Sequence, residues 1–119
     1  MNDGDTRVYL RFEFRIRPGM SEPFEVWARD RGMQFWPRQP GILSYRTFRP
    51  VPGSPLQKRL GGKRCRAHGW SFIEGVSLAA IETAMKTAEF RAIQREFLAF
   101  LEPGSVTHSV DSCSHETKT

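Results

Sequence analysis

The sequence predicts an α+β fold of the ferredoxin-like βαββαβ type, in which four antiparallel strands form one sheet and the helices cover one of its faces. Three observations predict this arrangement. Residues 7–17 alternate strictly between apolar and polar side chains, which is the period of a half-buried strand. Two stretches with helical periodicity, 21–36 and 78–102, each lie between strand-like runs. The repeated order of strand, helix and strand then indicates the plait.

The first helix is predicted to begin just after Pro18-Gly19, which ends the first strand. Ser21 is placed to accept a hydrogen bond from a free N–H of the first helical turn. Pro37 and Pro40 cannot continue a helix, so we expect this one to end near residues 35–36. Its apolar stripe consists of Phe24, Trp27, Ala28 and Phe35.

Three further strands are predicted over residues 42–49, 66–74 and 106–110, because Pro and Gly residues bound each apolar run. Alternation in the second of these runs assigns its side chains to two faces. One face holds His68, Trp70, Phe72 and Glu74, and the other holds Gly69, Ser71 and Ile73.

The second helical stretch is predicted to consist of two pieces, 78–86 and 88–102, with Ser77 as the cap of the first. Its apolar residues form two stripes that differ in direction by roughly 150°, so one straight helix cannot bury both. Thr87 lies at the change of phase and is a good N-cap for a new segment. The first stripe holds Leu78, Ile81 and Met85, and the second holds Phe90, Ile93, Phe97 and Leu101.

The 119 residues are expected to form one domain, 1–119, with a core over 6–111 and a polar C-terminal tail over 112–119. No apolar run approaches the roughly 18 residues needed to cross a bilayer, and the N-terminus lacks the pattern of a secretion signal. Cys65 and Cys113 fit no disulfide framework. We therefore expect a cytoplasmic protein without a membrane partner.

The net charge of +5 has a local origin. Residues 58–66 contain five basic residues and no acidic residue, which accounts for the whole excess of 18 basic over 13 acidic residues. We interpret this segment as a solvated hairpin loop. The alternative is a loop that meets a phosphate, a carboxylate substrate or nucleic acid.

The second face of the sheet is left without a helical cover. We expect Tyr9, Tyr45 and Trp70 on this face, where they are large residues to leave in water. A twofold homodimer that packs sheet against sheet would cover them.

Four short motifs each resemble a segment of the same protein family: Pro18-Gly19, Pro40-Gly41-Ile42-Leu43-Ser44-Tyr45-Arg46, Glu74-Gly75-Val76-Ser77-Leu78 and Thr87-Ala88-Glu89-Phe90. Together they resemble the antibiotic biosynthesis monooxygenase family over about residues 8–110. The resemblance implies a dimeric α/β barrel with a ligand pocket between the sheet and the helices of each subunit. Members of that superfamily include cofactor-independent oxygenases of polycyclic aromatics and haem-degrading enzymes.

The residues argue against the haem-degrading branch. That branch has an Asn on the first strand, a Trp before the last helix and a haem-ligating His within that helix. The corresponding positions here hold Phe12, Gly75 and Gln94, and a glutamine amide cannot replace the imidazole that haem iron commonly takes. We therefore expect no haem, and no other cofactor.

The predicted function is that of a monooxygenase-like protein that binds a small aromatic or enolisable metabolite. In the catalytic form of this prediction, the protein also oxidises the metabolite without a cofactor. His68 is the candidate base, because an imidazole can accept a proton at neutral pH. Arg31 interrupts the apolar stripe of the first helix and is the candidate cation for an enolate or carboxylate. The candidate substrate-binding residues are the aromatics Trp27, Tyr45 and Trp70.

Each candidate also has a structural interpretation. Arg31 can pack its stem on the core and hold its guanidinium in water. His68 can be a strand residue at the sheet edge or at an interface, and the tryptophans can belong to the core or to an interface. The corresponding function is that of a non-catalytic ligand-binding or structural dimer.

Two other classes of site find little support. His108, Cys113 and His115 lie close together in sequence but match no zinc spacing, so no metal site is expected. Residues 68–74 resemble the strand with which RNA-recognition modules stack bases. Gly75 stands where that module has a second aromatic, which argues against nucleic acid as a partner.

Overall fold

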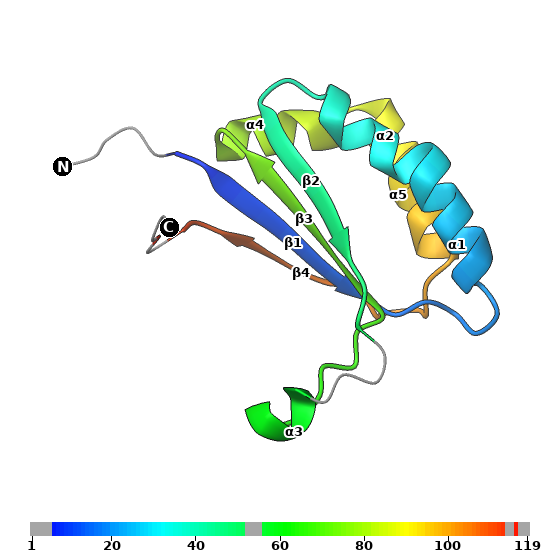
Figure 1. The fold of residues 1–119 in the computed structure, drawn as a ribbon. Helices are drawn as coiled ribbons and strands as arrows, with labels where there is room; N and C mark the ends of the chain where they lie inside the picture. The colour runs from blue at the N-terminus through cyan, green and yellow to red at the C-terminus, as the bar shows by residue number, and fades with distance from the viewer. Residues whose placement is uncertain (1–5, 52–55, 114–115, 117–119) are drawn as a thin grey trace.

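The chain folds into a four-stranded antiparallel sheet with helices along one face, as the sequence predicts (Figure 1). This computed structural model describes residues 6–51, 56–113 and 116. The strand order is β2-β3-β1-β4, which brings the first and last strands side by side. The strands are β1 (Val8–Phe14), β2 (Ile42–Phe48), β3 (Gly69–Gly75) and β4 (Thr107–Asp111).

The first helical stretch runs on through four segments: α1 (Ser21–Trp27), the π-helical η1 (Ala28–Gly32), α2 (Met33–Phe35) and the 3₁₀-helical η2 (Trp36–Arg38). The stretch extends beyond its predicted end, because Pro37 lies in the first turn of η2. Amides of a first helical turn have no hydrogen-bond partner within the helix, so the N–H that proline lacks is not needed there. The predicted cap at Ser21 is wrong. Ser21 is the first helical residue, and Met20 precedes it without a side-chain cap.

The second helical stretch is divided as predicted into α4 (Leu78–Met85) and α5 (Ala88–Ala99). Both predicted caps are confirmed, since Ser77 Oγ accepts from the Ala80 amide at 3.2 Å and Thr87 Oγ1 from the Phe90 amide at 3.0 Å. The predicted stripe of α4 is wrong at its ends: α4 buries Ile81 and Ala84, whereas Leu78 and Met85 are exposed. None of the described helices has the length and apolar character to cross a lipid bilayer.

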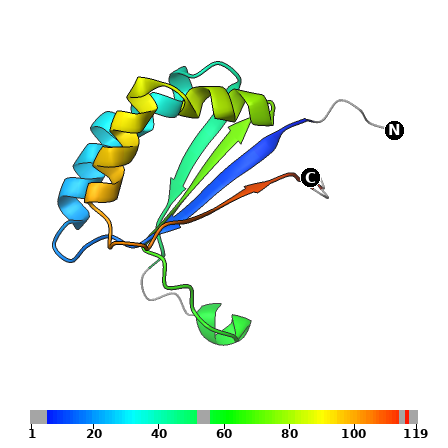
Figure 2. The same cartoon turned by 180° about the vertical axis from the view of Figure 1, so that it is seen from behind.

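The register between the central strands β1 and β3 shows which residues lie on each face of the sheet. Leu10, Phe12 and Phe14 of β1 lie opposite Ile73, Ser71 and Gly69 of β3, on the inner face that the helices cover (Figure 2). The other face, which we call the open face, is not covered by any helix of the described part of the chain. It carries Tyr9, Arg11, Glu13, Trp70, Phe72 and Glu74 from these two strands.

A bulge in β2 determines which face Tyr45 occupies. Ile42 pairs with Gly75 and Ser44 with Glu74, so Leu43 is an extra residue between them. Because a bulge reverses the alternation beyond it, Tyr45 lies opposite Ile73 on the inner face, not on the open face where it was expected. Tyr9 and Trp70 do lie on the open face, as predicted.

The basic segment is only partly a loop, because residues Leu56–Leu60 form the short helix α3. In both views α3 stands away from the sheet, on the side opposite the helices. Val51, Leu56 and Leu60 are the most exposed large apolar residues of the described chain, at 72%, 59% and 81%. Near the sheet, the Arg15 guanidinium donates to the carbonyl of Arg66 and so ties this segment to β1.

Candidate functional site

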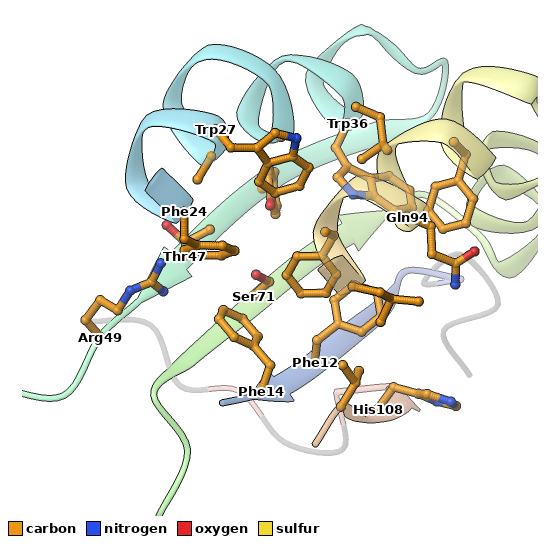
Figure 3. Close-up of a pocket in the computed structure, with 18 residues that line it drawn as sticks. Phe12, Phe14, Phe24, Trp27, Trp36, Thr47, Arg49, Ser71, Gln94 and His108 are labelled. Carbon is orange, nitrogen blue, oxygen red and sulfur yellow. The ribbon is translucent and has the colours of Figure 1, made fainter. Parts of the chain in front are cut away.

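A cavity of about 120 Å³ lies between the inner face of the sheet and the helices (Figure 3). Aromatic rings form a large part of its wall, and several of them pack on one another. Phe14 meets Phe97 edge to face at 5.2 Å between centroids, and Trp27 stacks on Phe97 at 5.9 Å. The wall also includes Phe12, Phe24, Trp36 and Phe90.

The π-helical segment η1 shapes the roof of the cavity. Gly32 is buried there, and a Cβ atom on it would lie 3.0 Å from Cζ3 of Trp27. The indole therefore lies directly on bare backbone, which leaves room for the ring beside the cavity. Short π-helical segments are frequent at functional sites.

Polar groups enter the cavity from the sheet. Tyr45, Thr47 and Arg49 follow one another at every second position of β2 and its extension, and Ser71 faces them from β3. Tyr45 and Ser71 both line the cavity, and the Ser71 hydroxyl lies near enough to the phenol to influence its ionisation. Burial raises the pKa of the Tyr45 phenol above its usual range, although the Ser71 hydroxyl and the Arg49 charge oppose this shift. Tyr45 is therefore a neutral hydrogen-bonding group at physiological pH.

Arg49 closes one end of the cavity. Its guanidinium lies over the rings of Phe24 and Phe14, with its Cζ 5.1 and 5.4 Å from their centroids. Gly69 makes this position possible, because a Cβ atom there would come within 2.6 Å of Cζ of Phe14 and would also meet the guanidinium. Outside the cavity, Glu25 Oε1 accepts from Arg49 Nε at 2.9 Å.

Trp27 and Tyr45, two of the three predicted substrate-binding residues, both line this cavity. Trp70, the third, lies on the open face, where its indole donates to Glu13 at 3.2 Å. The structure thus brings two of the three predicted aromatics together and places Trp70 on the other side of the sheet.

The two predicted catalytic residues do not line the cavity. Arg31 Nε and Nη2 donate to the two carboxylate oxygens of Glu96 at 2.8 and 3.0 Å, on the outer surface of the helices. His68 precedes β3, and its Nδ1 accepts from the Ile16 amide at 2.8 Å. Both residues thus make contacts within the chain away from the cavity, although Arg31 is ion-paired with Glu96 and His68 lies just before β3, which is not an edge strand. Their catalytic role stays a prediction that the geometry does not favour.

Arg49, Thr47, Ser71 and His108 also line the cavity, although the sequence patterns predicted none of them as ligand-binding residues. The alternation of side chains along β2 would have assigned Thr47 and Arg49 to the inner face if the sequence had indicated the bulge at Leu43. His108 lies opposite Phe12 in the register of β1 and β4, so its strand position puts it on the inner face. Figure 3 shows His108 and Arg49 on opposite sides of the cavity.

Residues that could hold a metal or haem are sparse. Among the described residues, no group of three or more His, Cys, Asp or Glu side chains could hold a metal ion, and His115 lies outside the described residues. Phe12 and Gln94 line the cavity, and neither offers an imidazole. At Gly75 a larger side chain would lie within 2.9 Å of Ile81, so the Trp of the haem-degrading branch would not fit there.

Comparison with solved structures places this architecture among known proteins. The chain superimposes on a variant of SnoaB, a cofactor-independent oxygenase from Streptomyces nogalater, with a TM-score of 0.70 and 15% identity over 93% of this chain and 96% of that one. It also superimposes on a candidate antibiotic biosynthesis monooxygenase from Caulobacter crescentus CB15, with a TM-score of 0.66 and 12% identity over 94% of this chain and 93% of that one. The chain therefore has the antibiotic biosynthesis monooxygenase fold.

A third structurally similar protein is a dimeric ferredoxin-like protein of unknown function from Jannaschia sp. CCS1. Its TM-score is 0.71 at 11% identity, over 90% of this chain and 99% of that one. No protein-family model matches the sequence, and no curated protein matches it either. The similarity thus confirms the predicted fold, and at these identities it carries the fold alone.

Proposed function

We propose that the cavity between the sheet and the helices binds a small aromatic or enolisable metabolite. The observation that carries this proposal is the aromatic wall around a space of about 120 Å³. For comparison, an apolar cavity of roughly 150 Å³ in another protein holds benzene. A single substituted ring matches the size and the apolar character of this space. The hydroxyls of Tyr45 and Ser71 then orient it.

We extend the proposal to oxidation of that ligand by O₂ without a cofactor, because the structurally similar SnoaB is a cofactor-independent oxygenase. In such a reaction, the enolised substrate supplies the electrons to O₂, and the bound ligand and the aromatic wall together would limit the access of water to the carbanion. His108 is the lining side chain suited to accept a proton, and it is exposed at the rim. Ligand binding has stronger support than oxidation. A catalytic base needs a polar group that orients it, and among the described residues none is seen beside the His108 imidazole.

The second candidate function is a ligand-binding dimer without catalysis. The specific observation in its favour is that Arg31 and His68 are both engaged in contacts away from the cavity. The two candidates share a bound ligand and differ only in turnover. Oxygen consumption with phenols or enolisable ketones, without added metal or flavin, distinguishes them.

We also propose that the protein forms a homodimer through the open face. Trp70 and Phe72 are half-buried there, and Phe48 on β2 packs edge to face on Phe72 at 5.3 Å. A second sheet would remove these rings from water. Light scattering with Phe72→Glu tests this: a monomeric variant from a dimeric parent supports the proposal, and a monomeric parent contradicts it.

The binding proposal is tested by filling the cavity. Ala28 lines it from η1, whereas Ala79 is exposed on α4. We expect Ala28→Leu to abolish binding of one-ring phenols, followed by tryptophan fluorescence, and Ala79→Leu to retain it. Equal binding by both variants, each with a normal melting curve, would contradict the proposed site.

A further inference from the structure

The cavity has an unusual charge balance. Among the residues that the structure describes, no Asp or Glu lines it, and its two basic residues, Arg49 and His108, lie on opposite sides (Figure 3). An aromatic site with an accessible cation would favour carboxylate ligands, because the cation would supply charge-assisted hydrogen bonds. Whether Arg49 is accessible in this sense therefore decides which ligands the cavity accepts.

Arg49 is already engaged on its polar edge. Nε and Nη2 both lie 2.9 Å from Oε1 of Glu25, and Nη1 donates to the Phe48 carbonyl at 3.2 Å. Glu25 itself does not line the cavity, and 58% of its side chain is exposed. The carboxylate thus neutralises the guanidinium from outside, while the apolar ring faces of Phe14 and Phe24 lie beneath it.

The sheet offers a ligand a different kind of partner. Ser71 is buried, with 5% of its surface exposed, and it lines the cavity together with Tyr45. Each of the two hydroxyl groups offers one O–H donor and lone pairs that can accept. This suits a neutral hydroxyl or carbonyl oxygen, whereas a buried carboxylate needs a counter-charge to offset its desolvation.

We propose that Glu25, by pairing with Arg49, makes the cavity select neutral oxygen-bearing aromatic ligands over aromatic carboxylates. Glu25 is then a specificity-determining residue outside the ligand's contact surface, and Ser71 with Tyr45 forms the oxygen-binding pair. The inference rests on the proposed function, because it requires that the cavity takes an aromatic ligand. It goes beyond that function by naming the charge class of the ligand and the residue that sets it.

The test compares phenol, benzoate and toluene as ligands of the full chain, by NMR titration. The wild-type protein should bind phenol more tightly than benzoate. In Glu25→Gln the amide oxygen can still accept from Arg49, but the positive charge is no longer balanced. We expect benzoate to bind about tenfold more tightly in this variant, the size of one charge-assisted hydrogen bond, and phenol to bind unchanged.

Glu22→Gln is the matched control, since it removes the same charge from an exposed position of the same helix. It should leave the affinity for benzoate unchanged. Wild-type protein that binds benzoate as tightly as phenol would overturn the inference and leave the proposed function standing. An equal effect of the two glutamate variants would do the same, because it would indicate a general charge effect.

Ser71→Ala tests the oxygen-binding pair separately. The alanine fits the buried position, and it should weaken phenol binding about fivefold, the value of a neutral hydrogen bond, without weakening toluene binding. Equal losses for phenol and toluene would contradict the assigned role of Ser71. If none of the three ligands binds the wild-type protein, the proposed function itself fails, and the inference with it.

Discussion

The indole Nε1 of Trp27 donates a 2.8 Å hydrogen bond to Oε1 of Glu96, although the two residues lie on different helices and 69 positions apart. The same carboxylate accepts hydrogen bonds from Nε and Nη2 of Arg31. Glu96 therefore joins α1, η1 and α5 over the cavity and fixes the plane of an aromatic ring in its wall. The ion pair between Arg31 and Glu96 on the surface therefore also helps to hold the Trp27 ring in the cavity wall.

This cluster should make stability depend on pH below the neutral range. The Arg31 hydrogen bonds, with a further one from Trp27, lower the pKa of Glu96 from 4.5 to about 2. A lowered folded-state pKa contributes stability that is fully present above 4.5 and is lost as the pH falls towards 2. Urea unfolding of wild-type protein and Glu96→Gln should differ most above pH 4.5, and the difference should shrink towards pH 2.

The matched comparison is a double-mutant cycle with Arg31→Gln. Once Arg31 is neutral, Glu96→Gln should cost less than in the wild-type background, because the main partner of the carboxylate is gone. Strictly additive effects would contradict the coupling. Because both side chains are more than a third exposed, we expect a modest effect that salt weakens.

Gly69 should tolerate no side chain. In Gly69→Ala the new methyl group would meet Nη1 of Arg49 and would lie 2.6 Å from Cζ of Phe14, a ring that is 1% exposed. Overpacking of this kind costs about 1–3 kcal/mol of unfolding free energy. Adding Phe14→Leu shortens the clashing side chain, so the double variant should be more stable than the sum of the two single effects. Simple additivity would show that Phe14 is not the obstacle.

The break between α4 and α5 depends on one hydroxyl group. Thr87 Oγ1 caps α5 by accepting from the Phe90 amide, and Thr87→Ala should lower the unfolding free energy by about 1 kcal/mol. Thr83, exposed within α4, is the control position, and alanine there should change stability by about 0.5 kcal/mol or less. Chemical denaturation of the two variants measures both. Equal losses would mean that the helix break does not need the cap.

Most features that local chemistry determines could be predicted from the sequence, although the cap expected at Ser21 is not formed. Strand alternation, the caps at Ser77 and Thr87 and the break in the last helical stretch are each written within a few neighbouring residues, and the structure confirms them. The bulge at Leu43 is different, because no nearby residue signals it. Once inserted, it moved Tyr45, Thr47 and Arg49 to the inner face, and with them the polar side of the site.

The candidate catalytic pair could not be judged from sequence for a related reason. Arg31 interrupts an apolar stripe, which indicates a special environment but not its partner. The partner is Glu96, 65 residues away, and only the packing of α5 against η1 brings the two together. The role of an ionisable residue depends on such long-range contacts, whereas helix and strand periodicity does not.

His68 allows the structural and catalytic interpretations to be separated in one experiment. Its Nδ1 accepts from the buried Ile16 amide at 2.8 Å, and its own amide donates to the Phe14 carbonyl at 2.8 Å. His68→Leu removes the side-chain acceptor and leaves the Ile16 N–H unpaired, which costs about 1–3 kcal/mol. His68→Asn offers a carbonyl oxygen near the place of Nδ1, so it should recover much of this loss. If His68 anchors β1, ligand binding and any turnover should survive in the asparagine variant. If His68 is the base, turnover should vanish in both variants, whatever their stability.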